Sequence, residues 1–190
     1  MGNLQMIIHP GIGSTGTTAF QNNFLAKSQR ILCCGRPFHQ DNEYRKVHYM
    51  LTKAEDFEMD WLFLKKWFYS KKEKAVKQRK LAVLSDETLL DTNNNVSILF
   101  NRLKRVLPSF DCTLIVSIRN QFDILKSYWH GHASHLKDAP QPYKSNYVSL
   151  NSWLEWQFEQ YKRNQGQLLL YDYNRLDEII KFSFGEKKVV

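Results

Sequence analysis

The segment that most constrains the fold is a glycine- and threonine-rich string between an apolar run and a helical pattern. Residues 11–18 read GIGSTGTT; the apolar run Gln5–His9 precedes them, and a helical stretch from about Thr18 to Arg30 follows. Glycines let the backbone approach an anion, and the N–H groups at the start of a helix add the positive end of its dipole. The sequence therefore predicts a phosphate-binding loop between the first strand and the first helix of an α/β domain.

Apolar runs of strand length alternate with helical patterns along the rest of the chain. The runs Leu81–Leu84 and Thr113–Ile118 are typical of buried parallel strands, because both are short and apolar and the second is rich in β-branched residues. We expect helices at about Val96–Val106, about Gln121–His130, Leu150–Arg163 and about Tyr171–Phe182. Strands alternating with helices predict a three-layer, P-loop NTPase-like α/β fold with a central parallel sheet.

The length of 190 residues fits one domain. Near the end, Phe184 and Gly185 close a helix, and Lys187–Val190 begins what reads as another strand, which has no successor. We therefore expect a single domain over residues 1–190 with a truncated C-terminal part and an incomplete last strand.

Composition excludes several classes of protein. No run of 18 or more apolar residues is present, so we expect no membrane span, and the N-terminus lacks the basic region of a secretory signal. The three cysteines follow no framework spacing, which indicates reduced thiols in a cytoplasmic compartment. The histidines at positions 130, 132 and 135 have no Cys or carboxylate pair at ligand spacing, so we expect no metal site.

Positive charge is concentrated in one stretch. The formal net charge is +8, and residues 65–80 alone hold eight Lys or Arg and one Glu. These residues belong to a basic, helical insertion that we expect at about 55–80. The insertion is either a solvated helical face or a docking surface for an anionic acceptor or polymer. No nucleic-acid-binding motif accompanies the charge, so we expect no nucleic-acid partner.

The loop also matches part of a nucleotide-binding motif. The spacing from Gly11 to Gly16 is that of the pattern G-x-x-x-x-G-K-[ST], but Thr17 stands at the lysine position. An ATPase or GTPase would lose its phosphate-bridging lysine there. A P-loop kinase or NTPase is therefore a less favoured alternative, and Ser85-Asp86 is the nearest approach to a magnesium-binding aspartate at a strand end.

The sequence IIHPGIGSTGTTAFQNNFL resembles the 5′-phosphosulfate loop of sulfotransferases that use 3′-phosphoadenylyl sulfate (PAPS). It is most similar to bacterial carbohydrate-type members with the pattern H-x-G-x-x-K-T-G-T-T-x-x-Q. The matching residues are His9, Gly11, Thr15, Gly16, Thr17, Thr18 and Gln21. The resemblance implies that the loop from Gly13 to Thr18 holds the 5′-phosphosulfate. In the family, a lysine at the position of Ser14 contacts PAPS and helps the leaving group depart, so Ser14 is a candidate catalytic and binding residue.

A second segment, LIVSIRNQFDILKSYW, resembles the 3′-phosphate site of the same family. Arg119 follows the strand candidate, and Ser127 comes eight residues later in the next helix. An arginine at the carboxyl edge of a strand can fork onto a phosphate, and a serine two turns into the helix can face the same way. We expect Arg119 and Ser127 to bind the 3′-phosphate together.

The third segment, LAVLSDETLL, resembles the family's stretch that brings a carboxylate to the edge of the sheet. Glu87 is the candidate general base that would take the proton of an acceptor hydroxyl. The alternative is that Ser85 and Asp86 cap a helix and Glu87 lies in its first turn. His9 is a further candidate base, with a hydrogen-bonded core histidine as the alternative.

The resemblance runs from about Gln5 to Val190 and implies a sulfotransferase that carries a sulfuryl group from PAPS to a hydroxyl or amine. The acceptor would be a polyhydroxyl or anionic compound such as a polysaccharide. PAPS would be the co-substrate, and no metal would be needed. The alternative is a non-catalytic relative that binds PAPS or its product nucleotide without turnover, because Ser14 replaces the lysine.

Overall fold

The core of the protein is a four-stranded parallel sheet. A computed structural model describes residues 6–13, 15–35, 41–90, 96–107, 112–133, 148–163 and 168–184. The strands are β1 (Met6–His9), β2 (Ile31–Cys33), β3 (Leu81–Ser85) and β4 (Cys112–Leu114), in the spatial order β2-β3-β1-β4. The predicted α/β class and the parallel sheet are confirmed.

The register of the sheet brings the ends of three strands together. Ile8 on β1 lies between Leu84 on β3 and Leu114 on β4, and His9 pairs with Ser85. Because all pairs are parallel, the segments that leave β1, β3 and β4 emerge at the same carboxyl edge. Ligands of open α/β sheets bind at this edge.

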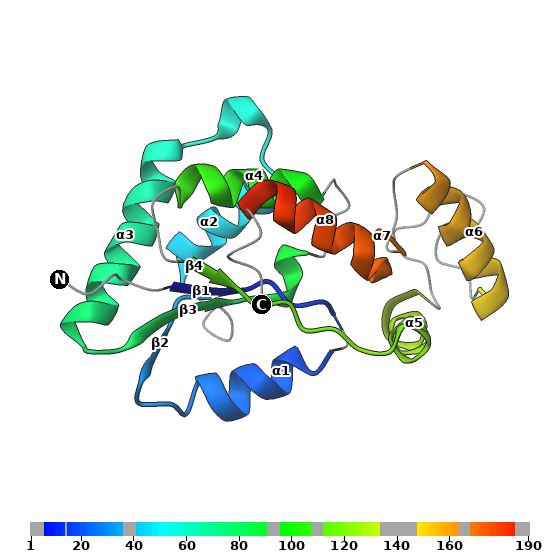
Figure 1. The fold of residues 1–190 in the computed structure, drawn as a ribbon, viewed down its shortest axis with the longest axis horizontal. Coiled ribbons are helices and arrows are strands. Elements are labelled where there is room, and N and C mark those ends of the chain that lie inside the picture. Colours follow the sequence, from blue (N-terminus) through cyan, green and yellow to red (C-terminus); the bar gives the residue numbers. More distant parts are fainter. Residues whose placement is uncertain are drawn as a thin grey trace.

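Helices cover both faces of the sheet (Figure 1). They are α1 (Thr17–Phe20), extended by a π-helical turn at Gln21–Leu25, α2 (Asn42–Thr52), α3 (Trp61–Lys77), α4 (Val96–Val106), α5 (Gln121–Tyr128), extended by a π-helical turn at Trp129–Ala133, α6 (Leu150–Lys162), α7 (Leu168–Tyr171) and α8 (Tyr173–Phe184). Short 3₁₀ turns span Asp56–Glu58 and Glu87–Leu89.

Chain topology explains this distribution. From β1 to β2 the chain moves one way along the sheet, and from β2 through β3 to β4 it moves the other way. Right-handed crossovers then place α1 on one face and α2, α3 and α4 on the opposite face, as Figure 1 shows. Beyond the carboxyl edge lie α5 and α6 (Figure 1).

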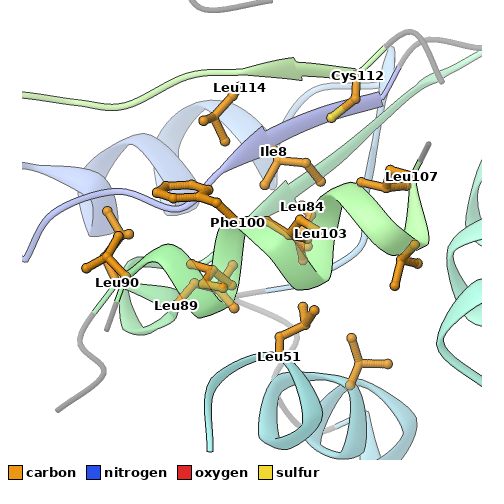
Figure 2. Packing of buried hydrophobic residues seen from close by; sticks show 14 of the residues in the cluster. Ile8, Leu51, Leu84, Leu89, Leu90, Phe100, Leu103, Leu107, Cys112 and Leu114 are labelled. Atoms are coloured by element: carbon orange, nitrogen blue, oxygen red, sulfur yellow. The ribbon is translucent and has the colours of Figure 1, made fainter. Parts of the chain in front are cut away.

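The main core lies between the sheet and α2, α4 and α8. Ile8, Leu84 and Leu114 project from the strands onto α4, where Phe100 and Leu103 are fully buried (Figure 2). Alternation along β1 explains the choice of residues, because Met6 and Ile8 face this layer while Ile7 is only half-buried. The core fixes the strand ends on which the loops are built.

Most predicted elements occur where the sequence placed them. The helix expected at Val96–Val106 is α4, with the same bounds, and the helical insertion expected at about 55–80 contains α3. The structure places α3 in the β2–β3 crossover, where it contacts β3. The strand expected at Lys187–Val190 lies outside the described residues.

Two local predictions were wrong or incomplete. The strand expected to reach Ile118 ends at Leu114, where its neighbour β1 also ends, at His9; beyond it the Ile115 N–H still donates to the Ile8 carbonyl at 2.9 Å. Three further elements have no counterpart among the predicted ones: β2 with three residues, α2 with eleven and α7 with four. Within the described residues, no helix is long and apolar enough to cross a membrane.

Candidate functional site

The loop after β1 depends on two glycines with left-handed backbone. Gly11 has φ of 51°, and a Cβ built there would lie 2.7 Å from Cγ2 of Thr17. Gly16 has φ of 83° and is the N-cap of α1, and its carbonyl accepts from the Phe20 N–H at 3.1 Å. Left-handed backbone favours glycine because a Cβ would approach the following carbonyl oxygen.

The rest of the loop is held by its threonines. The Thr15 hydroxyl donates to the Ile12 carbonyl at 2.6 Å, which closes a turn within the loop. A Cβ at Gly13 or Gly16 would meet no heavy atom within 4 Å, so there is open space beside both residues. Thr18 is exposed, and Ser14 lies outside the described residues. Because the Thr15 hydroxyl already donates within the loop, the exposed Thr18 hydroxyl and the backbone N–H groups of the loop are the donors that an anion in this space could use.

The side chain of Glu87 is hydrogen-bonded to the helical segment that follows the loop. It begins the 3₁₀ turn after β3, and its Oε2 accepts from the Thr17 hydroxyl at 2.6 Å and from the Gln21 amide at 3.4 Å. The cap of this turn is Asp86, whose side chain accepts from the Thr88 N–H at 2.9 Å. Glu87 therefore lies in the first turn of a capped segment and also reaches the loop.

The expected capping role of Ser85 is wrong. The Ser85 hydroxyl turns to the other side of the strand, where its oxygen lies 2.8 Å from Nδ1 of His9 and accepts from the Gln21 amide at 3.2 Å. This follows from the two-residue period of a strand, because neighbouring Ser85 and Asp86 must point to opposite faces.

His9 is a buried histidine with both ring nitrogens engaged. Its Nε2 lies 2.7 Å from the hydroxyl oxygen of Ser117, and its Nδ1 contacts Ser85. One ring nitrogen of neutral His9 donates and the other accepts, and the two serine hydroxyls can serve either role. Burial lowers the pKa of His9 below its usual value, and the negative charge of Glu87 opposes this shift.

The side chain of Asp86 is buried, and both of its carboxylate oxygens accept hydrogen bonds inside the protein. It is 2% exposed; Oδ2 accepts from the Tyr44 hydroxyl and Oδ1 from the Thr88 hydroxyl, both at 2.6 Å. A magnesium-binding aspartate presents an oxygen to the metal at the site. The observed contacts turn Asp86 towards α2 instead.

Arg119 and Ser127 are carried by the segment that continues from β4 into α5. Arg119 is exposed, and its backbone carbonyl accepts from the Tyr173 hydroxyl at 2.6 Å. Asn120 caps α5 by accepting from the Phe122 N–H at 3.0 Å, and Ser127 is half-buried in the second turn. Arg119 thus lies five residues beyond the end of β4, directly before the N-cap of α5, and does not end the strand as the sequence predicted.

A hydrogen-bonded chain of side chains joins three strand ends. It runs from Ser117 beyond β4, through His9 on β1 and Ser85 on β3, to Gln21 and Glu87. Ser117 was not among the predicted site residues; its local signal is that of a polar residue in the apolar run TLIVSI, two positions before Arg119. The loop, Glu87 and the start of the Arg119 segment therefore occupy one edge of the sheet.

Comparison of this chain with protein-family models, with curated proteins and with solved structures finds no match.

Proposed function

We propose that this protein is a PAPS-dependent sulfotransferase that transfers a sulfuryl group to a hydroxyl or amine of a carbohydrate acceptor. One observation carries the proposal: the parallel sheet brings the residue 11–18 loop, Glu87 and the segment leading to Arg119 to the same carboxyl edge. These three segments are those that resemble the sulfotransferase family in sequence.

The loop supports the nucleotide half of the proposal. Its left-handed glycines at 11 and 16 turn the backbone, and open space lies beside Gly13 and Gly16. A 5′-phosphosulfate placed there would accept from loop N–H groups and from the Thr18 hydroxyl. Preorganised donors of this kind stabilise the charge that develops on a leaving phosphate.

Glu87 supports the catalytic half. Hydrogen bonds from Thr17 and Gln21 fix one carboxylate oxygen beside the loop, so the position of the group is determined by the same helix that follows the loop. A carboxylate in this place could take the proton of an acceptor hydroxyl. In this proposal the neutral His9 orients Ser85 and Ser117 and is not itself the base.

Arg119 and Ser127 would hold the 3′-phosphate. Arg119, whose side chain is exposed, lies directly before the N-cap of α5, and the Tyr173 hydroxyl on α8 donates to its backbone carbonyl. A charge-assisted hydrogen bond of this type contributes about 1.5–3 kcal/mol. PAPS would be the co-substrate.

Calorimetric titration with 3′,5′-ADP, the product nucleotide, tests the proposal. We expect tight binding that is lost in Arg119→Ala and retained in Lys126→Ala, which changes an exposed cation on α5. ATP should not compete. Absence of 3′,5′-ADP binding by the folded wild-type chain would sink the proposal.

Ser14 favours a second candidate, a non-catalytic protein that binds the same nucleotides. The family pattern has a lysine where this chain has Ser14. Turnover of PAPS by wild-type protein, or by Ser14→Lys alone, separates the candidates: the sulfotransferase proposal expects wild-type turnover that Ser14→Lys increases. A binder without turnover in either form supports the second candidate. The buried contacts of Asp86 give no support to a kinase or NTPase.

A further inference from the structure

Six cations gather at the amino edge of the sheet, opposite the candidate site. We call this group the amino-edge basic surface; it consists of Lys27, Arg30, Lys74, Lys77, Arg79 and Lys80. Two segments distant in sequence contribute to it, and the Leu81 N–H joins them by donating to the Arg30 carbonyl at 2.9 Å. Lys80 is half-buried and the other five residues are exposed. In Figure 1 the ends of α1 and α3 meet the starts of β2 and β3 in this region.

The structure separates these cations from the rest of the basic stretch. Lys72 is 2% exposed, and Lys71 forms an ion pair with Asp41 at 3.2 Å, so neither is part of a free surface. Near the start of α3, Lys65 and Lys66 closely follow four acidic residues in sequence, of which Asp60 lies 4.0 Å from Lys46 of α2. The cations with few acidic neighbours in sequence therefore lie towards the end of α3.

The amino-edge basic surface contains almost no acidic residues. Residues 26–30 and 74–80 contain none, and the half-buried Glu73 is their nearest acidic neighbour in sequence. Among the residues that the structure describes, no ion pair involves any of the six cations. The end of a helix attracts cations to its carbonyls, which accounts for Lys74 and Lys77. It does not account for Lys27 or Arg30, which lie outside α3.

Arg79 occupies a position that normally favours glycine. Its φ is 55°, and it is the only residue other than glycine with positive φ in the described parts of the chain. It follows the C-cap of α3 in a Schellman arrangement: its N–H donates to the Val76 carbonyl at 2.9 Å, and the Lys80 N–H donates to the Ala75 carbonyl at 2.8 Å. An arginine that is strained where glycine would fit indicates a role for its side chain.

We propose that the amino-edge basic surface binds an anionic polysaccharide. Between the cations lie Ser28, Gln29 and Gln78, which can hydrogen-bond sugar hydroxyls. Residues 26–30 and 74–80 contain no aromatic side chain, and the exposed Phe24, one turn before Lys27, is stacked on Phe20 outside the surface, which leaves the surface itself without a ring on which a nucleobase could stack. This favours a charged sugar polymer over single-stranded nucleic acid.

The place of the surface determines its role. The five residues of β3 separate the two edges by about 17 Å, so several sugar units of an extended chain would be needed to occupy both. The surface therefore holds the polymer away from the reacting hydroxyl. This inference rests on the proposed sulfotransferase function, because it takes the bound polymer to be the acceptor.

Two triple variants test the surface. Arg30→Gln, Lys77→Gln and Arg79→Gln remove three of its cations, whereas Lys53→Gln, Lys65→Gln and Lys66→Gln remove three exposed lysines elsewhere. The probes are a heparin octasaccharide and an oligothymidylate with the same number of negative charges, titrated at several salt concentrations without nucleotide. We expect the first variant to bind heparin at least about tenfold more weakly, with a log–log salt slope smaller by about 2. The matched control should retain wild-type affinity and slope.

Arg79→Gly is the second test, because glycine fits the backbone there. It should bind heparin more weakly while its melting temperature stays equal or rises, which separates loss of charge from loss of fold. Equal losses in both triple variants, or tighter wild-type binding of the oligothymidylate than of heparin, would overturn the proposal. Titration with 3′,5′-ADP is run in parallel: a chain that binds this nucleotide but not heparin disproves the surface and leaves the sulfotransferase proposal standing.

Discussion

Gly11 combines two constraints at the first turn of the loop. Its φ of 51° is unfavourable for a residue with a Cβ, and that Cβ would press on Thr17, the residue that donates to Glu87. We expect Gly11→Ala to lower the free energy of unfolding by about 2 kcal/mol and to abolish 3′,5′-ADP binding. Urea denaturation and calorimetry measure the two effects.

The control for this prediction is Gly13→Ala in the same loop. The φ of Gly13 lies outside the left-handed range, and its Cβ would meet nothing within 4 Å, so the free energy of unfolding should change by less than about 0.5 kcal/mol. Equal losses in the two variants would show that the loop tolerates no side chain anywhere, and the backbone argument for Gly11 would fail.

His9 predicts a pH dependence of stability. Its folded-state pKa is lowered by burial, so below the ordinary imidazole pKa of about 6.5 the unfolded chain binds more protons than the folded chain. The free energy of unfolding should therefore fall as the pH drops from about 6.5 towards the folded-state pKa, and stay level above 6.5. Denaturation between pH 5 and 8 should show this slope in wild type and a flatter one in His9→Gln. An identical slope in the variant would assign the effect to another group.

At the scale of elements, Arg102 connects α4 to the end of α2. It is 7% exposed, and its guanidinium donates to the carbonyls of Met50 at 2.9 Å and Ala54 at 2.6 Å. These carbonyls belong to the unsatisfied C-terminal turn of α2 and its continuation. Arg102→Leu leaves them without a donor, and we expect a loss of about 2–3 kcal/mol in urea denaturation.

Arg105→Leu is the matched change on the same helix. The Arg105 side chain is exposed and lies 3.9 Å from the ring centre of Trp61, a contact of about 0.5–1 kcal/mol. A loss as large as that of Arg102→Leu would mean that charge, and not the capping of α2, determines the effect.

The same contrast explains which elements could be predicted from the sequence. The strand β3 and the helix α4 have strong apolar patterns in the sequence. Most residues of β3 are buried, and the buried residues of α4 recur at helical spacing. In β2 there are only three half-buried residues, too few for a period, and the end of β4 depends on where its neighbour β1 stops. Where a strand ends because its neighbour ends, the strand's own sequence carries no signal of that end.

The residues of the candidate site also differ in whether the sequence could predict them. Gly11, Gly16 and Glu87 stand beside strand ends and could be predicted from spacing. Ser117 and Tyr44 could not, because each acquires its role from a partner more than forty positions away: Ser117 from His9, and Tyr44 from Asp86.

On the scale of the whole molecule, the two edges of one sheet have different chemistry. The carboxyl edge has glycine turns, hydroxyls and the Glu87 carboxylate, whereas the amino edge has six cations without a described acidic partner. A small nucleotide with two phosphate groups suits the first arrangement and a long polyanion the second. The parallel topology produces this separation, because every loop that follows a strand opens at one edge and every helix end that precedes a strand lies at the other.

Nucleotide binding at the carboxyl edge should therefore change two segments that are a hundred residues apart. A nucleotide held by the loop and by Arg119 bridges β1 and β4, so hydrogen exchange should slow in residues 11–18 and in residues 115–119 together when 3′,5′-ADP is added. At a hundredfold excess over Kd the free energy of unfolding should rise by about 2.7 kcal/mol. In Arg119→Ala both effects should largely disappear, while Lys126→Ala should show them in full. Protection of the loop alone in wild type would mean that the nucleotide does not reach Arg119, and the 3′-phosphate would then have to be held by other residues.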